Sequence, residues 1–464
     1  MKFSIKNMGL IKNSTLELGD LTVFVGYNNA GKTYIVYSLY GFLETFIKNF
    51  SIDNIQEIVS ELHNTGQVKI NLGELDYKKI FDSVAEKFSK ELFEIFSAKE
   101  EEFRGAQFLV ELEDPFTVLK NAQDRLSGQY ADGVIGKFYS DKSIATLKID
   151  YAEQFPCLIF EIVSGNRVKL SKDAIMHSIG SFILKLFFDV PFLLASERLG
   201  IPLFYRELDY RKIALFDQFQ ALSNKSGHVN PIEFFDLFDK AYAKYTLPIA
   251  DNIGFIRSVP DVVKKSGSAE VAVLNDYILS MVGGVYTNHP VEGLMFTSKP
   301  RSKHKFALTA NLWSSSVKSL AGLYFYIKHV ARPGHLLIID EPEIHLTAKN
   351  QLILARMLAA CVSNKIKVII TTHSDFLVKE FNNLIMLHNL SDERRQQFYA
   401  SKRGSQYSDR ERLDPNRVKM YFCEKGNVSP CPMDAYGFSV PSMDETIRFL
   451  NSVSDDLMLN MDRR

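Results

Sequence analysis

Unbroken apolar runs that end in polar residues recur along the chain. Residues 21–25 are nearly all apolar, residues 336–339 are all apolar, and residues 366–370 contain a single lysine. A strand that is covered on both faces of a parallel sheet has this pattern, because neither face meets water. Parallel strands present their carboxyl ends at one edge, where open α/β sheets bind ligands. We therefore expect the polar residues after these runs to meet at a site.

The remaining pattern is mixed. Alternating or short apolar segments separated by turn residues predict further strands, at residues 3–5, 14–18, 108–112, 144–149, 158–163 and 167–170 and in a hairpin over 285–296. Apolar residues three or four positions apart predict helices, at residues 34–46, 47–105, 175–188, 204–282, 347–361 and 442–459. Between residues 47 and 105 no heptad repeat is sustained, so no long coiled coil is expected there.

These elements predict an α/β fold assembled from separated segments. Its five parts are an N-terminal part with an antiparallel lobe (1–46 and 108–200), a helical insertion (47–107), a second helical insertion (204–282), a C-terminal part (283–390) and a small C-terminal extension that is a possible partner-binding region (391–464).

The composition is that of a globular protein and does not indicate which ligand it binds. The 464 residues are 46% hydrophobic and 24% charged, which is typical of a globular chain of two or three structural units. The 55 basic and 55 acidic residues give a formal net charge of +0, so bulk charge favours no partner. The four cysteines form no CxxC pair, and no apolar run approaches the roughly 18 residues of a membrane span. We expect a soluble, cytoplasmic protein with no membrane partner.

The segment Gly26-Tyr-Asn-Asn-Ala-Gly31-Lys32-Thr33 matches the phosphate-binding loop GxxxxGK[ST] at every position. It follows an apolar strand and opens a helix, which is the context that its chemistry needs. Backbone N–H groups and the helix N-terminus would hold phosphates, Lys32 would bridge the β- and γ-phosphates, and Thr33 would bind Mg²⁺. The predicted nucleotide-binding residues here are Gly26, Asn28, Asn29, Ala30, Gly31, Lys32, Thr33 and Tyr34.

Asp340 and Glu341 follow the strand at 336–339, and His373 follows the strand at 366–370. One carboxylate at such a position can support Mg²⁺ and the next can polarise the water that attacks a phosphate. Asp340 is the predicted metal residue, while Glu341, His373 and Lys32 are the predicted catalytic residues. The alternatives are a solvated acidic turn and a structural histidine.

Three further segments allow two interpretations each. The serines 314–316 open a helix, as simple caps or as an anion site. Glu197 and Arg198 could form a structural ion pair, or Arg198 could contact a phosphate or an interface. The basic turn at 299–305 could be merely solvated or could contact nucleic acid.

Taken in order, GYNNAGKT, the serine-rich helix start, IIDEPEIHL and TTHSD resemble the nucleotide-binding domain of ABC-type ATPases. The resemblance is to the SMC, RecF and OLD branch, particularly to stand-alone bacterial "AAA family" ATPases of defence operons. It implies a two-lobed ABC-type (P-loop) ATPase domain that uses ATP and Mg²⁺. It also implies a switch role for His373 and a signature role for Ser315 toward ATP held by a second subunit.

The family pattern also has departures here. Ser316 and Val317 follow Ser315, where the usual signature has glycines. Gln107 and Gln154 are the candidates for the Q-loop glutamine. OLD proteins add a Toprim nuclease after the ATPase, whereas the tail here has no acidic cluster of that kind, so a nuclease would be a separate partner.

Three functions follow from the resemblance. The first is an ATP-hydrolysing switch, an antiviral defence sensor that forms a head-to-tail ATP-dependent dimer or higher oligomer and controls an effector nuclease encoded nearby. The second is an SMC/RecF-like DNA repair ATPase that binds DNA directly, which would show a salt-sensitive DNA affinity. The third is a transporter subunit, which the large helical insertions disfavour.

Overall fold

A nine-stranded sheet has the strand order β5-β1-β2-β16-β15-β3-β14-β13-β9. This computed structural model describes residues 1–120, 133–140, 143–151, 155–164, 170–205, 245–298 and 307–461. Five adjacent strands of the sheet are parallel: β15 (Val418–Glu424), β3 (Leu21–Gly26), β14 (Lys367–Thr372), β13 (His335–Ile339) and β9 (Val190–Leu194).

Helices cover both faces of the parallel strands, as their apolar runs predict. Along β13, Leu336 and Ile338 join one apolar core, whereas Leu337 and Ile339 join the other. The first core contains α1 (Lys32–Asn49), α3 (Tyr77–Ile95) and α5 (Lys172–Phe187). The second contains α8 (Leu247–Val262), α9 (Leu274–Val282), α10 (Ser315–Phe325), α11 (Ala348–Ser363) and α12 (Asp375–Asn389). Burial on both faces stabilises the strands that carry the polar ends.

The antiparallel lobe begins where β2 (Ile11–Glu17) pairs with β1 (Lys2–Met8), and β1 pairs with β5 (Gln107–Glu111). A second, four-stranded sheet has the order β4-β8-β7-β6 and lies beside α2 (Ile55–Thr65) and α5. Its strands are β4 (Gln67–Asn71), β6 (Val134–Ser140), β7 (Ser143–Asp150) and β8 (Cys157–Ser164). The predicted α/β fold class, with a parallel part and an antiparallel lobe, is confirmed.

Two local predictions differ from the structure. Residues 47–105 are expected to be helical, yet β4 interrupts them, because it pairs with β8 far along the chain. Residues 391–464 are expected to be an extension, yet β15 pairs with β3, and β16 (Asn427–Pro430) joins β15 to β2. Three sequence predictions lie largely or partly outside the described residues: the strand at 167–170, the second helical insertion up to residue 244 and the basic turn at 299–305.

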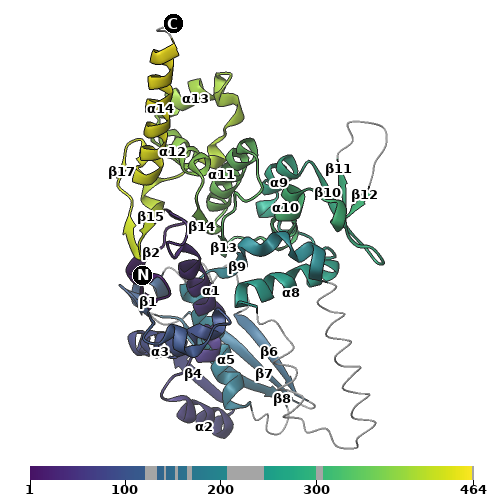
Figure 1. Cartoon of the computed structure of the whole chain (residues 1–464). Helices are drawn as coiled ribbons and strands as arrows, with labels where there is room; N and C mark the ends of the chain where they lie inside the picture. Colours follow the sequence, from purple (N-terminus) through teal and green to yellow (C-terminus); the bar gives the residue numbers. More distant parts are fainter. Residues whose placement is uncertain are drawn as a thin grey trace, which may run out of the picture.

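Smaller elements complete the chain. The predicted hairpin is present as β10 (Gly284–His289) and β11 (Gly293–Ser298), with β12 (Ala307–Thr309) added. After α13 (Asp392–Ala400), the two-stranded ribbon β17 (Met433–Asp434) and β18 (Gly437–Phe438) leads to α14 (Pro441–Met461). This last helix extends away from the rest of the molecule (Figure 1). Among the described residues, no helix combines the length and apolar character needed to cross a bilayer.

Candidate nucleotide-binding and hydrolysis site

The loop between β3 and α1 has the backbone conformation of a phosphate cradle. Gly26, Asn29 and Gly31 have positive φ angles of 142°, 57° and 92°. Such angles turn successive N–H groups into one concavity, which favours anions. Asn28 and Asn29 are exposed at its mouth, whereas Ala30 is buried beneath it. The free N–H groups at the start of α1 add a partial positive charge.

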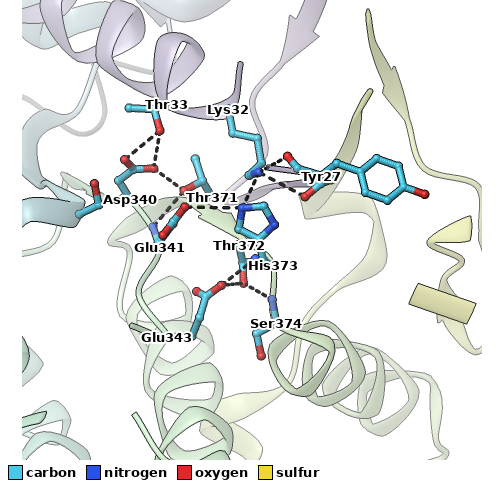
Figure 2. A network of polar contacts seen from close by, with 12 residues as sticks. Tyr27, Lys32, Thr33, Asp340, Glu341, Glu343, Thr371, Thr372, His373 and Ser374 are labelled. Atoms are coloured by element: carbon cyan, nitrogen blue, oxygen red, sulfur yellow. Dashed lines mark hydrogen bonds and ion pairs between the residues drawn. The ribbon is translucent and has the colours of Figure 1, made fainter. Parts of the chain in front are cut away.

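Lys32 points back into its own loop (Figure 2). Its Nζ donates to the carbonyl oxygens of Gly26 at 3.2 Å and of Tyr27 at 2.9 Å, and it lies 2.8 Å from His373 Nε2. Burial lowers the pKa of Lys32 from its ordinary value, while the surrounding carboxylates oppose that shift. These neutral acceptors hold the ammonium where a phosphate could replace them.

Thr33 and Asp340 face each other across the carboxyl edge of the sheet. The Thr33 hydroxyl lies 3.1 Å from Asp340 Oδ2, and the Thr371 hydroxyl donates to Asp340 Oδ1 at 2.5 Å. Burial raises the pKa of Asp340, which is fully buried. A hydroxyl and a carboxylate are oxygen donors of the kind that Mg²⁺ takes together with substrate phosphates, so this pair fits a magnesium ion. Among the described residues, no cluster of three or more His, Cys, Asp or Glu side chains offers a complete metal cage.

Glu341 has an unusual backbone that its neighbours hold in place. Its φ angle is 48°, in the left-handed region. Its N–H donates to the Thr371 hydroxyl at 2.9 Å, and its carbonyl accepts from Arg198 Nη2 at 2.8 Å. Fixed main-chain contacts on both sides stabilise a conformation that is otherwise costly, and such conformations cluster at functional sites.

Arg198 is neither an exposed phosphate contact nor the partner of Glu197. The short helix Ser196–Leu199 after β9 turns its guanidinium inward, where it is buried and donates to the carbonyls of Ala195 and Asp340 at 3.0 and 2.8 Å. Glu197 instead accepts from the Tyr37 hydroxyl at 3.2 Å. Burial lowers the pKa of Arg198, and the nearby carboxylates oppose that shift. Arg198 thus clamps the backbone that carries the two acidic residues.

His373 lies between Lys32 and Glu341. Its Nε2 is 3.5 Å from Glu341 Oε1, farther than from Lys32 Nζ. The imidazole is the largest cause of a lowered pKa for Glu341, and the charges of Lys32 and Arg198 act in the same direction. Glu343 Oε1 accepts from the His373 N–H at 2.6 Å and from the Thr372 hydroxyl at 2.7 Å. Glu341 is therefore kept ionised, as a general base must be.

Most of the predicted site residues are thus brought together, and the others lie elsewhere. Tyr34 lies in the first turn of α1, with its ring 5.0 Å from that of Phe96. Its contact with a nucleotide, through the main chain, stays a prediction. Ser315 is exposed at the start of α10, whose cap is Ser314, and makes none of the contacts drawn in Figure 2. Gln107 opens β5 opposite Lys6, and Gln154 is outside the described residues.

Several contributors escaped the sequence analysis. Thr371 bridges Asp340 and Glu341, Glu343 fixes His373, and Asn252 of α8 bonds to the backbone of Leu193 and Ala195. Thr371 and Glu343 lie within the TTHSD and DEPE motifs, which is the one signal that could have found them. Asn252 offers no signal, because its partners lie almost 60 residues away.

This geometry can hold a triphosphate, with its terminal phosphate among Lys32, Glu341 and His373. The family described as "AAA ATPase domain" matches residues 1–152 and 219–378, about two thirds of the chain. No curated protein sequence matches significantly.

Among solved structures, the chain is similar to an Smc head domain from Pyrococcus furiosus, crystallised with an extended coiled coil and the C-terminal domain of ScpA. The identity is 12%, the TM-score is 0.34, and 98% of each chain is covered. It is also similar to an SMC head domain from Thermotoga maritima, at 12% identity and a TM-score of 0.29, with 93% of this chain and 98% of that chain covered.

Proposed function

The chain belongs to the family of AAA ATPase domains, and from this premise we propose that it is an ATP-hydrolysing switch. The observation that carries the proposal is the convergence of Lys32, Thr33, Asp340, Glu341 and His373 at one edge of the sheet (Figure 2). These residues follow the carboxyl ends of β3, β13 and β14, which lie side by side in the order β3-β14-β13. A phosphate-binding loop beside an ionised carboxylate that can position a water molecule is one arrangement that supports ATP hydrolysis.

In the proposed reaction, Glu341 orients a water molecule and polarises it for in-line attack on the γ-phosphorus of ATP. Its lowered pKa keeps the carboxylate ionised near neutral pH, so that it can accept a hydrogen bond from that water. Lys32 leaves the carbonyls of Gly26 and Tyr27 and neutralises charge on the β- and γ-phosphates. Thr33 and Asp340 would hold Mg²⁺, which would supply positive charge toward the phosphates when bound. His373, released by Lys32, would donate to a γ-phosphate oxygen from the tautomer that carries its proton on Nε2.

The assembly is part of the same proposal. Ser315 lies outside the network in its own chain, as a residue that serves a second chain's ATP would. We therefore propose a head-to-tail dimer that closes over ATP, acts in the cytoplasm and controls a separate effector nuclease in antiviral defence. The motivation for a separate effector is the resemblance to defence-operon ATPases.

Glu341→Gln provides the test. The variant should bind Mg-ATP as tightly as the wild-type chain and lose at least about 100-fold in kcat, because it loses the base alone. Light scattering after size exclusion should show an ATP-dependent dimer of Glu341→Gln that Ser315→Arg abolishes. Lys32→Ala, which should lose ATP binding, serves as the control. ATP turnover that survives both Lys32→Ala and Glu341→Gln would contradict the proposal.

Direct DNA binding is the second candidate, and one surface favours it. A cavity of about 370 Å³ is lined by Lys264, Lys265, Lys328 and His329, beside α8 and the end of α10. Lysines that contact phosphates make affinity fall with salt concentration. If DNA binds here, Lys265→Glu with Lys328→Glu should weaken binding and flatten its salt dependence. Equal affinities for the variant and the wild-type chain would exclude this surface.

A further inference from the structure

The order of the strands indicates the direction in which a bound nucleotide lies across the phosphate-binding loop. β3, which leads into the phosphate-binding loop, lies between β14 and β15. His373 and Glu341 follow β14 and the next strand, β13, so the terminal phosphate lies on that side. The rest of the nucleotide then extends toward the other neighbour of β3, which is β15. The residues at the carboxyl end of β15 are therefore the ones that a nucleobase would meet.

Two aromatic side chains occupy that position. Tyr27, in the phosphate-binding loop, is 49% exposed, and Phe422, near the end of β15, is partly exposed. Their ring centroids are 6.0 Å apart and their planes meet at 71°, so the rings form an L-shaped corner. Figure 2 shows the Tyr27 ring directed away from Glu341 and His373. An exposed aromatic pair beside a polar phosphate site provides the apolar contact that such a site otherwise lacks.

Main-chain pairing between β15 and β3 fixes the two aromatic rings beside the phosphate-binding loop. Phe422 pairs with Val25 and Cys423 pairs with Gly26, the first glycine of the loop. A Cβ atom on Gly26 would lie 2.1 Å from the Cys423 carbonyl oxygen, so the two strands are in direct contact at this point. The position of Phe422 relative to the phosphates is thus set by sheet register rather than by a mobile loop.

A third segment lies beside the phosphate-binding loop on the side of the antiparallel lobe, where a Cβ atom on Gly31 would be 4.0 Å from Leu10 Cβ. The turn between β1 and β2 carries Leu10, which is 51% exposed. Lys12 N–H donates to the Gly426 carbonyl at 2.9 Å, and a Cβ atom on Gly426 would lie 2.3 Å from the Leu10 carbonyl oxygen. This turn therefore packs on the β15–β16 turn, beside the loop. Three segments distant in sequence therefore place apolar side chains beside the phosphate-binding loop.

We propose that Tyr27 and Phe422, with Leu10 at the edge, form the platform on which the base of the bound nucleotide stacks. The inference deepens the proposed function and rests on it, because a base arrives here only when its triphosphate occupies the loop. Stacking reads the flat face that every base has, rather than its hydrogen-bonding edge. The site therefore prefers purines to pyrimidines by contact area and discriminates weakly between ATP and GTP.

Calorimetric titration of the full chain with Mg-ATP, Mg-GTP, Mg-CTP and inorganic tripolyphosphate tests the platform. Phe422→Ala and Tyr27→Ala should each weaken the affinity for ATP by about 10-fold. The affinity for tripolyphosphate should not change, since tripolyphosphate has no base. Phe422→Tyr should keep the wild-type affinity. Tyr436→Ala, which removes an exposed aromatic ring from the turn before β18, is the matched control and should change nothing.

The outcomes separate the platform from the ATPase itself. An unchanged ATP affinity in both alanine variants would overturn the platform. An equal loss for ATP and for tripolyphosphate would also overturn it, because the loop rather than the base would have been affected. A wild-type chain that binds neither ligand would overturn the proposed ATPase function and the platform with it.

Discussion

At the scale of single residues, what the sequence reveals depends on how far away each partner lies. Lys32, Asp340, Glu341 and His373 are predictable because each follows an apolar run that marks a buried strand. The clamp made by Arg198 is not predictable, because the Asp340 carbonyl that it holds lies 142 residues farther along the chain. Its sequence neighbour Glu197 suggested an ion pair, but a buried guanidinium can be satisfied by carbonyl oxygens alone.

Replacing Asp340 and replacing Glu341 by their neutral amides should shift the melting temperature in opposite directions. Burial raises the pKa of Asp340 in the fold, so its ionised form costs stability, and this cost grows as pH rises above the unfolded value of about 3.9. The pKa of Glu341 is lowered, so its ionised form contributes stability that is lost as pH falls through the folded pKa. Without nucleotide and Mg²⁺ at pH 7, Asp340→Asn should therefore melt about 1–3 °C higher than the wild-type chain, and Glu341→Gln slightly lower.

Melting curves between pH 4 and pH 8 check both signs. Each difference should shrink toward pH 4, where the carboxyl groups of the unfolded chain become protonated. Two variants that shift the melting temperature in the same direction, or by amounts that do not change with pH, would contradict this account.

At the scale of elements, β3 and its neighbour β14 are predictable from the sequence, whereas the place of β15 on the other side of β3 is not. Its apolar run and the loop after it identify β3 from the sequence alone, because burial on both faces leaves a local pattern. β4 and β15 have no such signal of their location, since their pairing with β8 and β3 decides where they lie. Segments assigned to an insertion and to an extension therefore contribute strands to the two larger sheets.

The contact between β3 and β15 yields a paired glycine test. Gly26→Ala places a methyl group against the Cys423 carbonyl at a φ angle of 142°, so we expect a loss of about 2–4 kcal/mol in the free energy of unfolding and at least 10-fold in ATP affinity. Gly254→Ala, within α8 and facing open space, should instead stabilise the chain by up to about 1 kcal/mol. Denaturant titration measures the free energy of unfolding, and calorimetry measures the ATP affinity. Equal losses in Gly26→Ala and Gly254→Ala would exclude the steric clash with Cys423 as the cause.

At the scale of the whole molecule, α14 is separate from the packed body. Every side chain from Arg448 to Met461 is exposed, and seven of them are large and apolar: Phe449, Leu450, Val453, Leu457, Met458, Leu459 and Met461. Deleting residues 448–464 should leave the melting temperature within about 1 °C and ATP affinity unchanged, because the side chains of residues 448–461 are exposed. A fall of several degrees on deletion would show instead that α14 packs against the body or against a second chain.

The position of β15 has a consequence for how the protein is made. Gly26 emerges from the ribosome early, but the strand that flanks it is synthesised almost 400 residues later. At about 5–20 residues per second, the nascent chain waits roughly 20–80 s before that side of its phosphate-binding loop is complete. Nucleotide therefore cannot guide the early steps of folding. A chain that ends before residue 424 should lack the complete pocket, so ATP should not stabilise it.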